Sequence, residues 1–505
     1  MKNLLEIAKI VTKKRVNKIE IFDDNALKNK KSKFNIFYEA LVNNQLKNDR
    51  DAATLLYKST PTDAKYRQLK SRFKKRLLNT LFFLDVNTPS APNYERAYFS
   101  CNKDWVLINI LANNGAHHTV QSMARQTLTT SLKFKFADII IGCARLLRNY
   151  AAKNNDEKEF NSYNAIIQQY TEILNAEVKS EELFQQVFMY YQQSQEEINQ
   201  HMDLIEANAN QLVNLSDIYD SPIIFYNVYM VWILRFELSK EFESMLEVCE
   251  QAEQHLTGSG GFTQPQRQVQ FFIKRMSAYL HLRNYRQGKE SAERCLRLIR
   301  DRNTHWFIFM EYYMLLVFHT ENYIQASAIV KKAKSETNFK KLDLMEREKW
   351  NIFEAYLNYI IEVPFKNNPV LATQKSKSFK VSQFINQVAN YPRQYRNYNI
   401  LILVLQTLFL IDKRSYALAN ERIDQLRSLT NKRLKSEQFF RARQFVKLLI
   451  QLSKADFQIE EMRAHEKYYA RLLETPFFYR GQNAELEVIP YETLWNILTR
   501  QLQDT

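Results

Sequence analysis

The chain has 505 residues and a formal net charge of +16, but only 7 glycines and 10 prolines. Average usage would give roughly 35 glycines and 25 prolines at this length. Glycine provides the positive-φ corners of tight turns, and proline punctuates sheets and loops. The shortage therefore argues against sandwiches, propellers, barrels and glycine-dependent nucleotide folds, and it predicts a long, mainly helical protein of the all-α class.

The apolar residues are numerous enough for a large core but are not arranged for a membrane. The longest apolar stretch, Ile400 to Ile411, is interrupted by Gln406 and Thr407. It is shorter than the ~20 residues of a spanning helix, so we expect a buried helix and no membrane insertion. The N-terminus lacks the apolar core of a secretion signal, and the four cysteines form no CxxC pair. These features indicate reduced core cysteines and a cytoplasmic protein.

Most of the excess positive charge lies near the N-terminus. Residues 1–80 contain 20 Lys and Arg against 8 Asp and Glu, whereas residues 81–505 contain 51 against 47. Pro89 and Pro92 form the clearest early break in the chain. We therefore expect a basic helical module over 1–86 and a nearly neutral body over 95–505.

The basic module contains a short helix, a turn and a longer helix. Residues 49–57 read as the short helix, and the sequence Thr60-Pro61-Thr62-Asp63 resembles a helix start. Thr60 would cap the second helix, Pro61 would take its first position and Asp63 would supply the capping-box acid. This helix is expected to reach about residue 84. Its buried stripe is predicted to contain Tyr66, Leu69, Phe73, Leu77, Leu81 and Leu84.

The second helix of the module is a candidate nucleic-acid-binding element. A short helix, a turn and a basic helix have the layout of a helix-turn-helix. Phosphates would attract the cations that flank the apolar stripe, and Gln68 could reach base edges. Alternatively, this face is simply solvated or docks an acidic protein. The cations are Lys65, Arg67, Lys70, Arg72, Lys74, Lys75 and Arg76.

The body reads as helix after helix, with irregular segments expected near 256–267, 363–380 and 476–491. A degenerate repeat is clearest over 271–335, where the sequence from Asn284 to Gly288 (NYRQG) reappears as NYIQA from Asn322 to Ala326, a shift of 38 residues. His281 and His319 then take the same repeat position, which favours a structural role. Weaker copies begin at residues 241, 415 and 456.

These units resemble the tetratricopeptide repeat, in which an aromatic residue ends the turn between helices and a small residue follows three positions later. The resemblance implies antiparallel helix pairs stacked into a superhelical array, or α-solenoid, with a concave binding surface. A helix-turn-helix joined to such repeats is also similar in layout to peptide-responsive bacterial regulators.

Two carboxylates lie inside apolar helical runs of the body, each four or five residues after a tryptophan. One interpretation is that they line a partner groove together with neighbouring tyrosines. The alternative, which we favour, is that they are core acids paired with Lys, Arg or Tyr of a neighbouring helix. The candidate groove residues are Glu311, Tyr312, Tyr313 and Glu354.

The sequence contains no nucleophile, metal or phosphate motif, so we expect neither an enzyme nor a bound cofactor. The first functional hypothesis is an interaction scaffold that binds a protein or peptide in the concave surface of the repeat array. The alternative is a peptide- or protein-responsive regulator whose basic module binds DNA or RNA.

Overall fold

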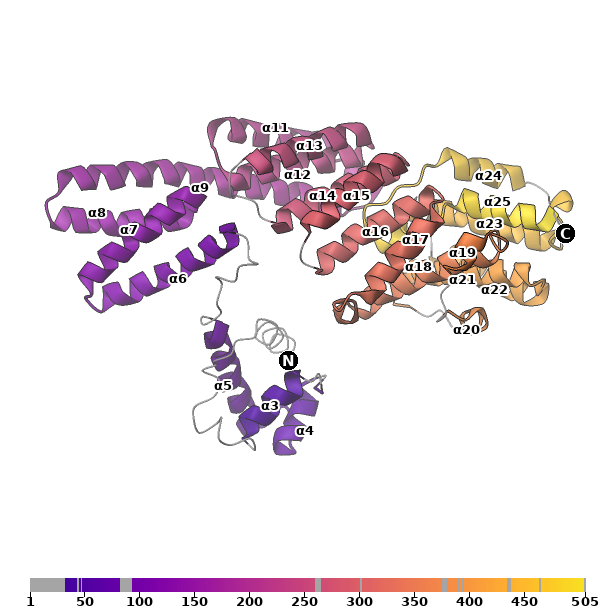
Figure 1. Cartoon of the computed structure of the whole chain (residues 1–505), viewed down its shortest axis with the longest axis horizontal. Coiled ribbons are helices and arrows are strands. Elements are labelled where there is room, and N and C mark those ends of the chain that lie inside the picture. Colours follow the sequence, from indigo (N-terminus) through magenta and orange to yellow (C-terminus); the bar gives the residue numbers. More distant parts are fainter. Residues whose placement is uncertain are drawn as a thin grey trace. The chain divides into compact units, whose positions relative to one another are not determined.

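The computed structural model describes residues 32–42, 45–46, 48–81, 93–258, 265–299, 302–374, 379–387, 391–392, 395–433, 437–462 and 465–503. These residues form the α-helices α3 to α25 and short 3₁₀ turns, with no β-strand among them, which confirms the all-α class (Figure 1). The predicted breaks at Pro89 and Pro92 lie outside them, as do residues 259–264 of the irregular segment predicted near 256–267. The chain divides into two compact units, Met1–Thr171 and Glu172–Thr505.

The first three described helices of unit 1 enclose a hydrophobic cluster of their own. They are α3 (Lys33–Val42), α4 (Asp49–Tyr57) and α5 (Ala64–Leu81). Tyr66, Phe73 and Leu77 of the predicted stripe are buried in this cluster, and Leu69 packs against it. The side chains of residues 81 and 84 lie outside the described residues.

The predicted start of the basic helix is wrong by three residues. The Asp63 carboxylate accepts hydrogen bonds from the main-chain N–H groups of Lys65 (2.7 Å) and Tyr66 (3.2 Å). Asp63 is therefore the N-cap, and Thr60 and Pro61 belong to the preceding turn. A single Asp oxygen that accepts from two N–H groups satisfies more of the helix start than the predicted Thr60 cap would.

The rest of unit 1 contains α6 (Asn93–Asn113), α7 (His117–Phe134), α8 (Ala137–Lys153) and the first part of α9 (Glu157–Tyr191). Helix α7 packs against both α6 and α8. The three helices surround a second cluster that includes Cys101, Ile140 and Cys143. Gly142 permits close packing here, because a Cβ at this position would lie 2.8 Å from the Trp105 ring.

Unit 2 continues with helices that pack in adjacent pairs, among them α12 with α13, α14 with α15, α16 with α17 and α21 with α22. The helices α12, α14 and α16 also contact one another in succession. The helices that follow α9 are α10 (Gln195–Asn199), α11 (Met202–Ile218), α12 (Pro222–Leu238), α13 (Phe242–Gly258), α14 (Pro265–His281), α15 (Tyr285–Leu298), α16 (Thr304–His319), α17 (Tyr323–Ser335), α18 (Leu344–Glu362), α19 (Pro369–Ala372), α20 (Val381–Ile385), α21 (Arg396–Asp412), α22 (Tyr416–Arg433), α23 (Phe440–Lys454), α24 (His465–Glu474) and α25 (Tyr491–Gln503).

The longest apolar stretch forms α21, whose residues 397–411 are all buried, as predicted. No helix in the described part of the chain has the length and apolar character needed to cross a membrane. The four cysteines are buried and free, and burial raises the pKa of the Cys143, Cys249 and Cys295 thiols to about 12. These cysteines are therefore core residues, as predicted.

The same turn connects helices again and again in both units. A residue with positive φ lies two positions before the next helix, its N–H bonds to the carbonyl three residues back, and the next N–H bonds five residues back. This is the hydrogen-bond pattern of a Schellman motif. Only one of these turns uses glycine, so the chain closes its helices with few glycines. The positive-φ residues are Gly115, Lys135, Asn155, Lys240, Arg283, Glu321 and Arg414.

These turns match two of the three weaker repeat positions that the sequence indicates, in addition to the clearest pair. Phe242, Tyr285, Tyr323 and Tyr416 all begin a helix two residues after a positive-φ residue. Residue 457 is different, because it has a positive φ itself and is followed by a 3₁₀ turn at Ile459–Glu461. The predicted copy at 456–460 therefore does not begin an α-helix.

Gly288 takes the small-residue position of the clearest repeat for a physical reason. A Cβ at Gly288 would lie 2.4 Å from Leu316 Cδ2 of α16 and 3.1 Å from Tyr279 Cβ of α14. The equivalent residue of the next unit, Ala326, is fully buried. Close helix packing therefore requires a small side chain at this position.

Candidate functional site

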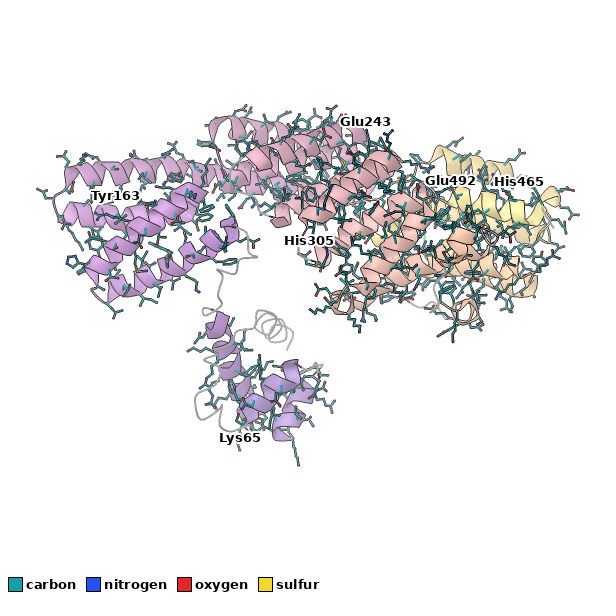
Figure 2. All side chains as sticks on the ribbon, in the orientation of Figure 1. Lys65, Tyr163, Glu243, His305, His465 and Glu492 are labelled. Carbon is teal, nitrogen blue, oxygen red and sulfur yellow. The ribbon has the colours of Figure 1, made fainter. Side chains whose placement is uncertain are left out.

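The outward face of α5 carries positive charge and no acidic residue. Lys65 points away from the cluster that α3–α5 enclose (Figure 2). Two of the candidate cations are already occupied. Lys70 forms an ion pair with Asp49 of α4 at 2.6 Å, and the Arg76 guanidinium lies over the Phe34 ring. The exposed residues of the candidate site are Lys65, Arg67, Gln68, Arg72, Lys74 and Lys75.

Asp49 links α4 to α5. Its Oδ1 accepts hydrogen bonds from the Tyr66 hydroxyl and from Lys70 Nζ, both at 2.6 Å. Burial raises the pKa of Asp49, but the hydrogen bonds from Lys70 and Tyr66 outweigh burial and lower it to about 2. Lys70 therefore holds two helices together. The exposed cations of this face are Lys65, Arg67, Arg72, Lys74 and Lys75, none of which forms an ion pair within the described residues.

An extended segment between α24 and α25, residues 475–490, runs through unit 2 (Figure 1). We call it the C-terminal strap. It contains one 3₁₀ turn at Asn483–Glu485 and no strand. Arg480 Nη1 donates to the carbonyl of Tyr191 in α9 at 2.9 Å, although 289 residues separate the two. The strap therefore packs against helices that lie far from it in the sequence.

The two repeat-equivalent histidines both bind this strap. His281 Nδ1 donates to the Ser277 carbonyl at 2.7 Å, and its Nε2 accepts from the Tyr479 N–H at 3.0 Å. His319 Nε2 donates to the Glu487 carbonyl at 2.8 Å. Burial lowers the pKa of His281 to about 4 and that of His319 to about 3. Both imidazoles are therefore neutral, and they hold the strap's main chain from equivalent repeat positions.

Three of the predicted groove residues are buried, and two of them, Glu311 and Tyr312, contact Tyr479 of the strap. Glu311, Tyr312 and Tyr313 are 3%, 3% and 1% exposed, so they do not line an open groove. Glu311 accepts from the Tyr479 hydroxyl and from Lys349 Nζ, the latter at 2.8 Å. Burial lowers the pKa of Lys349, but Glu311 and Glu346 outweigh burial and raise it. Glu311 is thus a core acid paired with Tyr and Lys, the alternative that the sequence analysis favoured.

A second buried acid, Glu237 of α12, was not identified from the sequence. It accepts hydrogen bonds from the Tyr191 hydroxyl (2.8 Å) and Ser277 Oγ (2.9 Å), and it pairs with Lys274. Burial raises the pKa of Glu237, but Lys274 outweighs burial and lowers it. These contacts join α9, α12 and α14, so we assign them a structural role.

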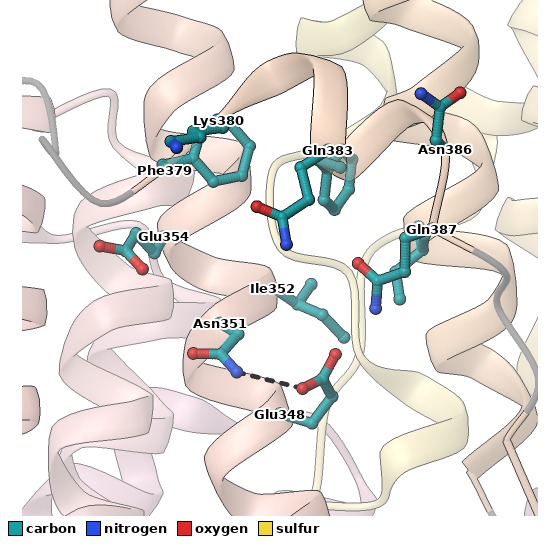
Figure 3. A pocket seen from close by; sticks show the side chains of 11 residues that line it. Glu348, Asn351, Ile352, Glu354, Phe379, Lys380, Gln383, Asn386 and Gln387 are labelled. Carbon is teal, nitrogen blue, oxygen red and sulfur yellow. Dashed lines mark hydrogen bonds between the residues drawn. The ribbon is translucent and has the colours of Figure 1, made fainter.

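The fourth predicted groove residue, Glu354, lines a pocket of about 760 Å³ between α18 and α20 (Figure 3). Glu354 pairs with Lys334 of α17 at 2.5 Å. Figure 3 shows Gln383 of α20 pointing across the pocket toward Ile352 of α18. The pocket joins amide and charged groups to an apolar wall, which is the mixture found at small-molecule and peptide sites. Its lining residues are Glu348, Asn351, Ile352, Glu354, Phe379, Lys380, Gln383, Phe384, Asn386, Gln387 and Ile402.

Buried polar contacts hold α20 against the helices behind it. Gln406 of α21 donates to the carbonyls of Phe384 (2.8 Å) and Gln387 (2.9 Å). Gln406 is fully buried. In the sequence, Gln406 is recognisable only as an interruption of an apolar run. An amide in such a run is buried, and a buried amide must bind a neighbouring segment.

No group of three or more possible metal ligands occurs in the described part of the chain. Comparisons with protein families, with curated proteins and with solved structures find no match to this chain. The candidate sites therefore rest on geometry alone.

Proposed function

We propose that the protein is a non-enzymatic interaction scaffold that binds an extended segment of a partner protein. In this proposal, antiparallel helix pairs stack into a tetratricopeptide-like α-solenoid. The repeated Schellman turns, the adjacent helix pairs and the close packing at Gly288 support such an array.

The observation that carries the proposal is the pocket between α18 and α20. Asn351 and Gln383 bring side-chain amides to this pocket, and an amide can both donate to and accept from a peptide main chain. Ile352 and Phe384 add apolar surface for a side chain of the partner. The predicted groove residues Glu311, Tyr312 and Tyr313 are buried, so the open pocket is the better place for a partner.

A pocket-filling substitution tests this proposal. A random peptide library is panned against the full chain, and the selected peptides are measured by fluorescence anisotropy. Gln383→Trp should reduce their affinity at least tenfold, because the indole would occupy the pocket. Ser382→Trp is the matched control, since Ser382 is exposed on the same helix and does not line the pocket. Equal affinities for the two variants would contradict the proposal.

A second candidate function is nucleic-acid binding by α5, as part of a regulator. The observation that favours it is the acid-free outward face with five cations that form no ion pair within the described residues, Lys65, Arg67, Arg72, Lys74 and Lys75. A helix of this kind fits the major groove of DNA, and each phosphate contact adds to the salt dependence of binding.

Fluorescence anisotropy with a labelled random-sequence DNA duplex and an RNA hairpin tests this candidate. Arg72→Ala/Lys75→Ala should weaken binding and reduce the salt slope by roughly two contacts. The control variant Lys158→Ala/Lys340→Ala removes equal charge from exposed positions of other helices and turns and should have little effect. If the two double variants weaken binding equally, α5 is not the nucleic-acid interface.

A further inference from the structure

The geometry points to the chemistry of the partner segment at the pocket between α18 and α20: a basic side chain, Lys or Arg, lies against Glu348, and the partner's main chain is held by Gln383. This inference rests on the proposed scaffold function and adds to it the residue type that the pocket selects. It is carried by the hydrogen-bond partners of Glu348, by the free amide of Gln383 and by the charges around them.

Glu348 is a carboxylate with neutral partners. Its Oε1 accepts from the Tyr391 hydroxyl at 2.6 Å, and its Oε2 accepts from Asn351 Nδ2 at 3.1 Å (Figure 3). Within the described residues, no cation pairs with it. A carboxylate oxygen has two lone pairs, so each oxygen of Glu348 keeps an acceptor position for a further donor.

The neighbouring carboxylates of α18 differ from Glu348 in this respect. Glu354 is paired with Lys334 at 2.5 Å, and Glu346 is paired with the buried Lys349 at 3.3 Å. Lys380 also lines the pocket, but within the described residues its ammonium forms no ion pair with Glu348. The negative charge of Glu348 is therefore not paired with a cation within the described residues, and a cation from a partner would complement it.

The contacts of Asn351 fix the orientation of its amide. Lys334 Nζ donates to Asn351 Oδ1 at 3.0 Å, which turns the Nδ2 group toward Glu348. Burial and the hydrogen bond to Glu348 both raise the pKa of Tyr391, so its hydroxyl stays protonated and remains a donor. Glu348 is thus held in place before any ligand arrives, which lowers the entropic cost of binding.

The remaining walls suit a long basic side chain attached to a peptide. Gln383 forms no hydrogen bond within the described residues, so its amide is available to a main-chain N–H and C=O. Ile352 and Phe384 are buried side chains that reach the pocket, and the aliphatic stem of Lys or Arg can cover them. A guanidinium would also form charge-assisted hydrogen bonds with both oxygens of Glu348.

The test combines peptide selection with a double-mutant cycle. A random heptapeptide library displayed on phage is panned against the full chain, and we expect the selected peptides to share Arg or Lys at one position. For a selected Arg peptide, E348Q should reduce affinity at least tenfold, and replacing Arg by the neutral isostere citrulline should do the same. The two changes together should cost little more than either one.

E466Q is the control, because it makes the same change at an exposed glutamate of α24 that does not line the pocket. It should change affinity less than threefold. Selected peptides without a shared basic residue, or an E348Q effect that adds independently to that of citrulline, would overturn the basic-residue inference and leave the scaffold proposal standing. A library that enriches no peptide would contradict both.

Discussion

Arg441 of α23 binds Glu487 of the C-terminal strap with two parallel hydrogen bonds. Arg441 Nε and Nη2 lie 2.8 Å from the two carboxylate oxygens, and the two residues are 9% and 3% exposed. Arg441 Nη1 also donates to the Leu472 carbonyl at 2.9 Å. Burial lowers the pKa of Arg441, but Glu487 outweighs burial and raises it. A desolvated bidentate pair of this kind makes the strap an integral part of unit 2.

We expect Arg441→Met to destabilise unit 2 strongly. The substitution keeps an unbranched side chain but leaves Glu487 buried without a cation, which costs about 3–5 kcal/mol when a buried pair is broken. Urea denaturation followed by circular dichroism measures the loss. The control is Lys289→Met, since Lys289 forms only an exposed pair with Glu293 at 3.9 Å and should contribute less than about 1 kcal/mol. Equal losses for the two variants would show that the strap is not anchored by Arg441.

The two histidines that hold the strap predict a pH dependence of stability. The folded pKa values are about 4 for His281 and about 3 for His319, below the ordinary value of 6.5. The unfolded chain then binds more protons than the folded chain, so stability falls as pH falls below about 6.5. Each histidine contributes up to about 1.4 kcal/mol per pH unit, until the pH reaches its folded pKa.

Urea midpoints at pH 7.5, 6 and 5 measure this dependence. His281→Asn removes the titrating group and should make the fall between pH 6.5 and 5 shallower than in the unaltered protein. His201→Asn is a useful comparison, because His201 lies outside the strap contacts and stacks on Tyr190 instead. If His281→Asn leaves the pH dependence unchanged, the stability loss comes from other groups.

At the repeat position of Gly288, even the methyl side chain of alanine should lower the free energy of unfolding. A Cβ at this position would lie 2.4 Å from the fully buried Leu316 side chain, so Gly288→Ala should destabilise unit 2 by about 1–3 kcal/mol through overpacking. Arg286→Ala, on the exposed face of the same helix, should change stability by less than about 0.5 kcal/mol. Thermal unfolding compares the two. A neutral Gly288→Ala would mean that α14, α15 and α16 can separate without loss.

The local features of the fold were predictable from the sequence because they depend on residues close together in the chain. The spacing of Tyr285 and Tyr323 locates equivalent turns, and the stripe from Tyr66 to Leu77 locates the buried face of α5. The relation between His281 and His319 also follows from the repeat. The start of α5 was misplaced because Thr60 and Asp63 can both cap a helix, and only the turn geometry decides between them.

The long-range contacts were not predictable. Glu311 and Tyr479 are 168 residues apart, and neither helical periodicity nor composition relates a helix residue to a distant extended segment. Nothing in the sequence indicates that the hydrogen-bond partners of Glu348 are neutral, because Tyr391 lies 43 residues away. The apolar neighbours of Glu311 in the sequence were enough to suggest a core acid, but its partners could be identified only from the tertiary fold.

The glycine-poor turns predict that stability can be gained at the positive-φ residues. Arg414 has φ 56°, a left-handed conformation that costs a non-glycine residue about 1–2 kcal/mol. Glycine avoids this cost, but its greater conformational entropy in the unfolded chain cancels part of the gain. Arg414→Gly should therefore stabilise unit 2 by about 0.5–1 kcal/mol, and Arg414→Val should destabilise it, because a β-branched side chain fits this conformation poorly. Gln425 is exposed to solvent in the middle of α22, so Gln425→Gly should instead destabilise unit 2, by about 1 kcal/mol. Urea denaturation of the three variants measures the differences, and a destabilising Arg414→Gly would contradict the assignment of backbone strain to these turns.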